Sequence, residues 1–182
     1  MDTTSITFIT SNAAKAEQLG RHLDYPILHK KLDLAEIQSL DLKEVVEQKA
    51  KEAYRRLEQP VLVEDTSLTF SALGRLPGPL IKWFLSELGN EGLSHILNGY
   101  ESREALAEVC FGLYDGKELK FFEGSMKGTI AKQPIGEQGF GWDPIFVPNG
   151  HEKTWGEMSI EEQKETSMRR IALKKLESFL KP

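Results

Sequence analysis

The chain has 182 residues, of which 40% are apolar and 28% are charged, and its formal net charge is −5. This length fits a single domain over residues 1–182 with a core of substantial size. The negative net charge argues against broad attraction to nucleic acid or to an anionic membrane surface. We therefore expect neither partner, and any phosphate-binding site has to be built from local groups.

Features that bear on location favour the cytoplasm. The single cysteine, Cys110, lies in the apolar run 105–113 and cannot form an intrachain disulfide, which suits a reducing compartment. The first residues contain neither a basic segment nor a long apolar stretch, and no run approaches the roughly 20 residues of a membrane span. We expect a cytoplasmic protein with Cys110 in its core.

The first half of the chain alternates strand and helix patterns. Strands are predicted over 6–10, 26–34 and 61–63, and helices over 13–23, 42–57, 81–88 and 91–97. The segment 74–79 is too rich in glycine and proline to be regular. This order is typical of an α/β protein.

The second half indicates antiparallel pairing. Strand patterns over 104–114 and 118–123 flank Asp115-Gly116, a strong hairpin signal, and a further strand is predicted over 127–131. Ser159 and Glu162 have the spacing of a capping box, which starts a helix predicted to run to about Leu180. A mixed sheet with helices on its faces follows from these elements.

Acidic residues follow two of the predicted strands. Glu64 and Asp65 close the buried run 61–63, and Glu36 follows the second strand. If these strands are neighbours, three carboxylates meet at one sheet edge, where Mg²⁺ accepts hard oxygen ligands together with water and substrate phosphate. The alternative is a set of solvated strand-end acids. Zinc is disfavoured, because the four histidines have no ligand spacing and there is one cysteine.

Two basic segments are candidates for binding phosphate. Thr10 to Lys15 places small polar residues between a strand and a helix N-terminus, where backbone N–H groups favour an anion. The alternative is an Asn12 helix cap beside a solvated lysine. Lys82, in the apolar stretch 80–85, is either a phosphate ligand or a surface lysine whose stem covers apolar groups.

The segment Gly139-Phe-Gly-Trp-Asp-Pro144 combines two aromatic side chains, two glycines and an acid. An exposed Phe140 or Trp142 can stack on a nucleobase, while Asp143 accepts a hydrogen bond from the base or ribose. The alternative is that the aromatic side chains belong to the core.

Taken together, these segments resemble the inosine/xanthosine triphosphate pyrophosphatase family, and the resemblance covers nearly the whole chain. The matching blocks occur in order at 10–15, 34–38, 63–67, 72–79, 81–84, 140–144 and 167–169. The resemblance implies Mg²⁺-dependent hydrolysis of inosine, deoxyinosine and xanthosine triphosphates to the monophosphate and pyrophosphate. It also implies an elongated mixed sheet, two lobes around a central cleft, and a homodimer.

The resemblance also assigns roles to residues of this chain. Asp65 and Glu64 orient or deprotonate the attacking water, Lys15 assists catalysis, and Glu36, Asp65 and Glu64 hold the metal. The residues assigned to substrate binding are Thr10, Ser11, Asn12, Lys15, Lys49, Thr66, Ser67, Lys82, Phe140, Gly141, Trp142, Asp143, Lys164, Ser167, Met168 and Arg169.

Three positions depart from the family pattern. Ser11 stands where the family has glycine, and Met168 stands where it has a histidine directed at the base. Gln163 occupies a position expected to hold lysine, and Lys164 is one residue late, about 100° around a helix. We predict pyrophosphohydrolase chemistry with a weaker or different base preference. The other hypotheses are a relative retuned to another modified nucleotide and a nucleotide-binding protein without turnover.

Overall fold

The computed structural model describes residues 6–10, 16, 19, 23, 25 and 27–181. Most of the helix predicted over 13–23 lies outside the described residues, as do Ser11, Asn12 and Lys15. Among the residues that are described, no helix is long and apolar enough to cross a lipid bilayer.

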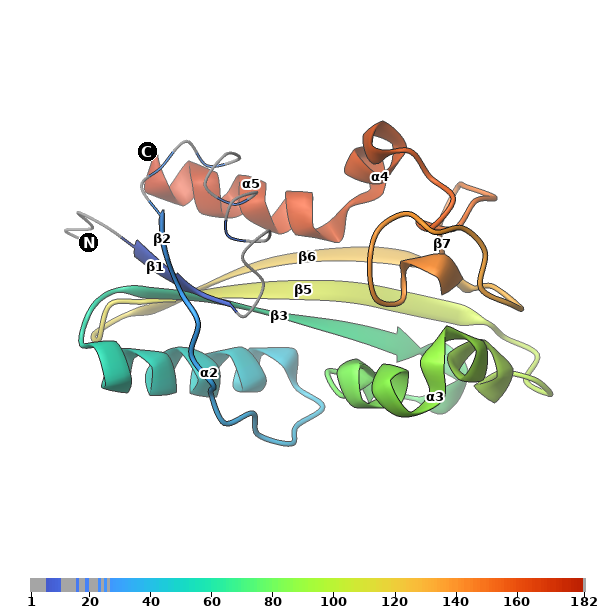
Figure 1. Ribbon diagram of the computed structural model, residues 1–182, viewed down its shortest axis with the longest axis horizontal. Coiled ribbons are helices and arrows are strands. Elements are labelled where there is room, and N and C mark those ends of the chain that lie inside the picture. Colours follow the sequence, from blue (N-terminus) through green and yellow to red (C-terminus); the bar gives the residue numbers. More distant parts are fainter. Residues whose placement is uncertain are drawn as a thin grey trace. The chain divides into compact units, whose positions relative to one another are not determined.

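The described residues form a seven-stranded mixed sheet in the order β2-β1-β3-β5-β6-β7, with β4 paired to β3 off this path (Figure 1). The strands are β1 (Ile6–Ile9), β2 (Ile27–Lys30), β3 (Val61–Phe70), β4 (Pro77–Gly78), β5 (Glu104–Tyr114), β6 (Leu119–Ile130) and β7 (Phe146–Pro148). β1 is parallel to β2 and β3, whereas β4 is antiparallel to β3 and β7 is antiparallel to β6. The predicted mixed sheet is confirmed.

Helices connect and cover these strands. They are α2 (Leu42–Leu57), α3 (Ile81–Ile96), α4 (Ile160–Thr166) and α5 (Met168–Leu180), with short 3₁₀ helices η1 (Ser71–Leu73) and η2 (Asp143–Ile145). The α/β class predicted from the alternating patterns is therefore confirmed.

The chain folds into two compact units, which agree with the two expected lobes. Unit 1 contains residues 1–65, 109–123 and 171–182, and unit 2 contains residues 66–108 and 124–170. The chain passes from one unit to the other inside β3, β5, β6 and α5. The central cleft and the single domain stay predictions.

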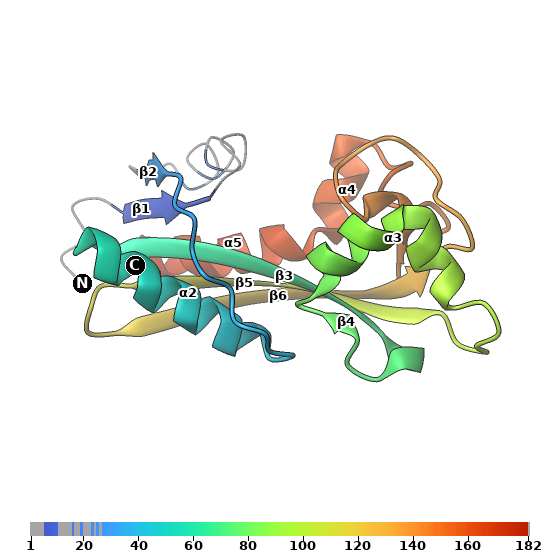
Figure 2. The same ribbon diagram turned by 60° about the horizontal axis from the view of Figure 1, so that its bottom comes forward.

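In unit 1, α2 lies against one face of the sheet and α5 runs along the other (Figure 2). Asp41 caps α2, because its Oδ1 accepts hydrogen bonds from the backbone N–H groups of Lys43 at 2.9 Å and Glu44 at 3.3 Å. The buried face of α2 packs against β1, β3 and Cys110. Cys110 is fully buried, which confirms it as a core residue, and burial raises the pKa of its thiol to about 12.

In unit 2, Arg103 joins the second half of α3 to the end of β6. Its Nη2 donates to the backbone carbonyls of Ser94 and Ala131, both at 2.8 Å, and its Nε donates to that of Ile130 at 2.7 Å. Burial lowers the pKa of this guanidinium, which stays charged because the ordinary pKa is so high. The guanidinium thus provides hydrogen-bond donors for backbone carbonyls near the end of α3 and at the end of β6.

Two strands are longer than the sequence pattern predicts. β3 continues to Phe70, and its second half pairs with β4 through Leu68 and Thr69, so that Glu64 and Asp65 lie inside a strand and not at its end. β6 is continuous from Leu119 to Ile130, although two separate strands were predicted over 118–123 and 127–131. A Cβ at Gly128 would lie 2.3 Å from the Val147 carbonyl oxygen, so this glycine allows β7 to pair closely.

Two other predicted elements are shorter or broken. The second strand ends at Lys30 and not at Leu34. The predicted C-terminal helix is two helices, because Ser167 takes an extended conformation between them, with φ −70° and ψ 113°. The capping box at Ser159 and Glu162 is confirmed.

Candidate functional site

Lys49 brings two of the predicted acids together in unit 1. Its Nζ lies 2.9 Å from Asp65 Oδ2 and 3.2 Å from Glu36 Oε1. The contact with β3 follows from strand alternation, because Asp65 is on the same face as Val61 and Val63, which pack against α2. Glu36 reaches Lys49 from the irregular segment between β2 and α2.

The Lys49 ammonium is largely buried, with a side chain that is 12% exposed. Burial by itself lowers the pKa of Lys49, but the charge of Asp65 and its hydrogen bond, followed by those of Glu36, outweigh this effect and raise the pKa above its ordinary value. Lys49 is therefore a fixed positive charge between two carboxylates.

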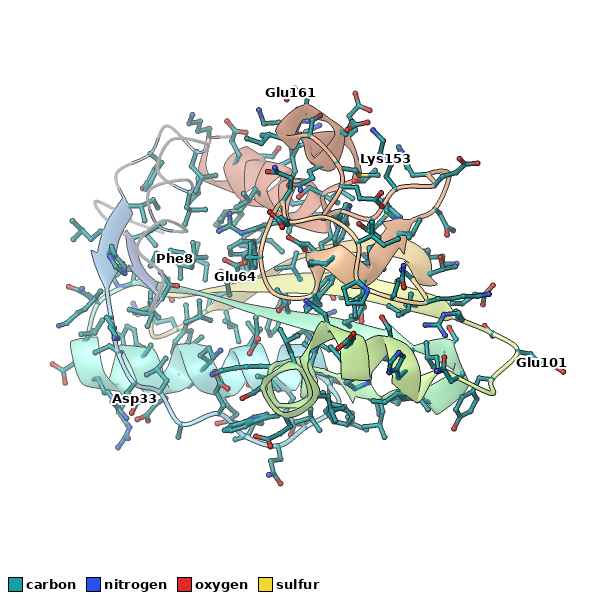
Figure 3. All side chains as sticks on the ribbon, turned by 45° about the vertical axis from the view of Figure 1, so that its right-hand side comes forward. Phe8, Asp33, Glu64, Glu101, Lys153 and Glu161 are labelled. Carbon is teal, nitrogen blue, oxygen red and sulfur yellow. The ribbon has the colours of Figure 1, made fainter. Side chains whose placement is uncertain are left out.

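Glu64 does not join this pair. It is next to Asp65 on β3, so it faces the other side of the sheet, away from α2 (Figure 3). The expectation that three carboxylates meet at one sheet edge is therefore wrong in its geometry. Among the residues that the structure describes, no group of three or more His, Cys, Asp or Glu side chains is arranged to hold a metal ion.

Glu36 and Asp65 fit a divalent cation that takes only some of its ligands from the protein. Asp65 and Glu36 both direct an oxygen at one cationic group, and Mg²⁺ typically takes one or two protein carboxylates and completes its shell with water and substrate phosphate. These two residues could hold such an ion.

At the end of β1, Thr10 is fixed through its backbone. Its N–H donates to the Lys30 carbonyl at 3.3 Å, and its own carbonyl accepts a hydrogen bond from His29 Nε2 at 2.8 Å. Of the segment 10–15, the structure describes only this residue.

The predicted residues of unit 2 differ in exposure. Ser67 is buried, and Thr66 is half-buried beside it on β3. Lys82, on the first turn of α3, is exposed, and its Nζ lies 5.8 Å from the centre of the Trp83 ring. This position is compatible with either reading of Lys82.

The segment 139–143 divides its two aromatic side chains between core and surface. Trp142 is 8% exposed and packs against Phe146 and Trp155, with ring centres 5.8 Å and 5.6 Å away. Phe140 is 65% exposed. Trp142 thus packs into an aromatic cluster of the core, whereas the Phe140 side chain lies largely at the surface.

Asp143 shapes this segment through its side chain. Its Oδ2 accepts a hydrogen bond from the backbone N–H of Phe140 at 2.8 Å. Gly139 and Gly141 have positive φ angles of 77° and 65°, and a Cβ at Gly139 would lie 2.0 Å from Asp143 Oδ2. The conformation of the segment thus requires glycine at 139 for two separate reasons.

One contact to the segment comes from a residue that sequence reasoning did not single out. Asn90 Nδ2 donates to the Gly141 carbonyl oxygen at 2.8 Å, across 51 residues of sequence. The available signal was the Gly89-Asn90 pair, which interrupts an otherwise helical pattern.

The C-terminal candidates lie around the break between α4 and α5. Gln163 Nε2 donates to the Trp155 carbonyl at 2.6 Å, and the Trp155 indole N–H donates to Thr166 Oγ1 at 2.8 Å. Met168 is buried, with 8% of its surface exposed. Lys164 is exposed, while Ser167 and Arg169 are half-buried. Gln163, which stands where a lysine was expected, therefore links α4 to the backbone at Trp155.

The sequence model of the Ham1 family matches residues 6–179 of this chain. The inosine triphosphate pyrophosphatase of Schizosaccharomyces pombe is 42% identical over 180 residues, which cover 97% of this chain and 95% of that protein. The protein of the same name from Yarrowia lipolytica is 43% identical over 182 residues, with the same coverage.

Solved structures resemble this fold over almost its full length. The Staphylococcus aureus Ham1 protein has a TM-score of 0.88 and 27% identity, and the match covers 98% of each chain. A structure from Mycobacterium abscessus, described as a nucleoside-triphosphatase and dITP/XTP pyrophosphatase, has a TM-score of 0.81 and 27% identity, covering 95% of this chain and 98% of that one.

Proposed function

Because the chain belongs to the Ham1 family, we propose that it hydrolyses non-standard purine nucleoside triphosphates to the nucleoside monophosphate and pyrophosphate. The substrates are the triphosphates of inosine, deoxyinosine and xanthosine. The observation that carries the proposal is the Glu36–Lys49–Asp65 cluster, in which one buried cation lies between two carboxylates. The names of the relatives supply the reaction class, and this cluster supplies groups that fit it.

In the proposed reaction, positive groups offset the charge of the triphosphate. Thr10, Ser11 and Asn12 bind phosphate oxygens, and Lys15, Lys49 and Lys82 neutralise them. Asp65 orients the water that attacks the α-phosphorus and accepts its proton, and pyrophosphate leaves. Glu64, Thr66 and Ser67 belong to the same strand and are proposed to line the substrate site.

Mg²⁺ is the proposed metal, and Glu36 and Asp65 would hold it. When bound, it would stabilise the negative charge that develops on the phosphate oxygens. The donor set supports this choice, because the two carboxylates are hard oxygen ligands and the described histidines do not cluster with them.

The base is proposed to bind at segment 139–143. Phe140 stacks on the purine, and Gly141, Trp142 and Asp143 form the adjoining wall. Lys164, Ser167, Met168 and Arg169 are proposed to complete the base-reading region, and the Arg169 guanidinium can donate to the O6 atom that distinguishes inosine from adenosine. Because Met168 replaces an imidazole, we propose that base selectivity is weaker than, or different from, the family norm.

We also propose a homodimer in the cytoplasm. Trp83 and Leu88 on α3 are 60% and 43% exposed, and such apolar side chains favour burial against another chain. The buried thiol of Cys110 agrees with a reducing compartment. Sedimentation at several protein concentrations would test the dimer.

A turnover panel tests the proposed function. Inosine, xanthosine, guanosine and adenosine triphosphates would each be incubated with Mg²⁺ and with a chelator, and monophosphate and pyrophosphate would be resolved from diphosphate and orthophosphate. We expect Mg²⁺-dependent release of monophosphate and pyrophosphate, fastest for inosine or xanthosine triphosphate. Release of orthophosphate, or no turnover of any of the four, would contradict the proposal.

A further inference from the structure

The helix α3 is interrupted at Gly89, which has φ 63° and ψ 179°. A Cβ at this position would meet nothing within 4 Å, so the glycine is required by its backbone conformation and not by crowding. The interruption starts the second half of α3 at Asn90. The side chain of this residue is thereby placed at the beginning of a helical segment.

Asn90 uses that position to reach the segment 139–143. Its Nδ2 donates to the Gly141 carbonyl oxygen at 2.8 Å, and η2 begins at Asp143, the last residue of this segment. The orientation of the amide is set by chemistry, because a carbonyl only accepts and so requires the NH₂ end.

The other end of the same amide is costly to bury. Asn90 Oδ1 is buried and has no hydrogen-bond partner among the described residues. A buried acceptor without a partner loses its hydrogen bonds to water and gains none in return, a penalty that an apolar side chain would avoid. Stability alone therefore does not favour asparagine at this position, whereas a requirement to hold Gly141 does.

The tethered residue lies between the two aromatic side chains of the segment. Trp142 packs against Phe146 and Trp155 in the core. The backbone N–H of Phe140 donates a hydrogen bond to the Asp143 carboxylate. Gly141 connects these two points and has a positive φ. A hydrogen bond to its carbonyl restrains the Gly141–Trp142 peptide, and thereby the backbone that directly follows the exposed Phe140.

We propose that Asn90 is a positioning residue for nucleobase binding, which acts by holding Gly141 so that Phe140 presents a fixed stacking surface. The inference rests on the proposed function, because it assigns the base to this segment. Asn90 does not touch the reacting phosphates. Its loss weakens base binding and leaves the chemical step unchanged.

Asn90→Asp removes the donor without changing the shape of the side chain and places a carboxylate against the Gly141 carbonyl. Asn90→Ala removes both amide groups and is the second variant, in case the first is poorly folded. Asn98→Asp is the matched control, since Asn98 is exposed in the turn after α3. Thermal unfolding would show that each protein is folded.

Two measurements test the tether and its consequence separately. Amide hydrogen exchange of residues 138–143 needs no substrate and should become faster in both Asn90 variants and not in Asn98→Asp. In turnover, we expect the KM for inosine triphosphate to rise about five- to tenfold, the loss of one hydrogen bond, with kcat within twofold. The dissociation constant of inosine monophosphate should rise in parallel, while inhibition by pyrophosphate stays unchanged.

The outcomes separate this inference from the proposed function. Unchanged hydrogen exchange in the segment, or a fall in kcat with an unchanged KM, would overturn the role of Asn90. Equal weakening of inosine monophosphate and pyrophosphate would also overturn it, because the effect would not be specific to the base. If the parent protein failed to hydrolyse inosine triphosphate, the proposed function would fail, and hydrogen exchange would still test the tether.

Discussion

The acid–lysine cluster of unit 1 and the aromatic segment of unit 2 are held in different ways. Lys49, Glu36 and Asp65 come from three segments and meet through charge, with distances of 2.9 and 3.2 Å between the partners. Residues 139–143 are held by the buried Trp142 and by two glycines with positive φ. Two hydrogen bonds add to this, one from Asn90 to the Gly141 carbonyl and one from the Phe140 N–H to Asp143. Under the proposed function, the first region acts on the triphosphate and the second binds the base.

This difference predicts which kinetic constant each region controls. Charges near the reacting phosphates act more strongly on the transition state than on bound substrate, so their loss lowers kcat. A stacking surface contributes to ground state and transition state alike, so its loss raises KM. Substitutions in the two regions are therefore expected to separate these constants.

Asp65→Asn is expected to give the largest effect. The amide keeps the shape of the side chain but cannot accept the proton of water, so turnover of inosine triphosphate should fall by about 10²- to 10⁴-fold. Binding of inosine monophosphate, measured by calorimetry, should be retained. Asp33→Asn is the matched control, since Asp33 is exposed in the same unit (Figure 3). Turnover within twofold of the parent would remove Asp65 from the chemical step.

Lys49→Met should affect stability and turnover together. Removal of the cation leaves two facing carboxylates, and we expect the free energy of unfolding to fall by about 1–3 kcal/mol, less than for a fully buried pair because both acids are partly exposed. Added Mg²⁺ should raise the denaturation midpoint more in this variant than in the parent, since it supplies the missing charge.

Lys51→Met is the control for this experiment, because Lys51 lies on the same helix and pairs with Glu47 at the exposed surface. Its unfolding free energy should change by less than about 0.5 kcal/mol. An equal response of both variants to Mg²⁺ would contradict the assignment of Asp65 and Glu36 as metal ligands.

The two acids of the unit 1 cluster are easier to find in the sequence than the tether of the unit 2 segment, for a physical reason. Glu36 and Asp65 are acids next to apolar strand patterns, and both properties are visible locally, although Lys49 was assigned only through the family resemblance. Alternation along β3 would have separated Glu64 from Asp65 had the full strand been predicted. The Asn90–Gly141 hydrogen bond joins positions 51 residues apart and leaves no periodic signal.

In the fold, too, locally determined features were predicted correctly and features that depend on tertiary contacts were not. α2 and β5 have the predicted bounds, because an aspartate cap defines the start of α2 and a long, mostly apolar pattern defines β5 locally. The single break expected within β6 and the continuous helix expected after Ser159 were both wrong, since both features depend on tertiary contacts. Within β6, glycine is needed at 128 because the Val147 carbonyl approaches it closely.

Gly139→Ala should give an intermediate effect that is confined to KM. The new Cβ has to displace the Asp143 carboxylate, which breaks its hydrogen bond to Phe140, and the positive φ adds a cost of about 1 kcal/mol. We expect the KM for inosine triphosphate to rise about tenfold, with kcat within threefold. Gly99→Ala is the control, because it has a positive φ of 92° but no atom within 4 Å of the new Cβ. A fall in kcat alone would break the separation between the two regions.

Met168→His should give the smallest effect and tests the base-reading part of unit 2. Met168 begins α5 and is 8% exposed, so an imidazole there is largely buried and is favoured in its neutral form, with one donor and one acceptor. If this position reads the base, the ratio of kcat/KM for inosine over adenosine triphosphate should rise a few-fold, about 1 kcal/mol of discrimination. Met158→His, a second buried methionine in the same unit, controls for the cost of burying the ring. An unchanged ratio in Met168→His would mean that discrimination comes from other residues, with the Phe140 segment and Arg169 the first to test.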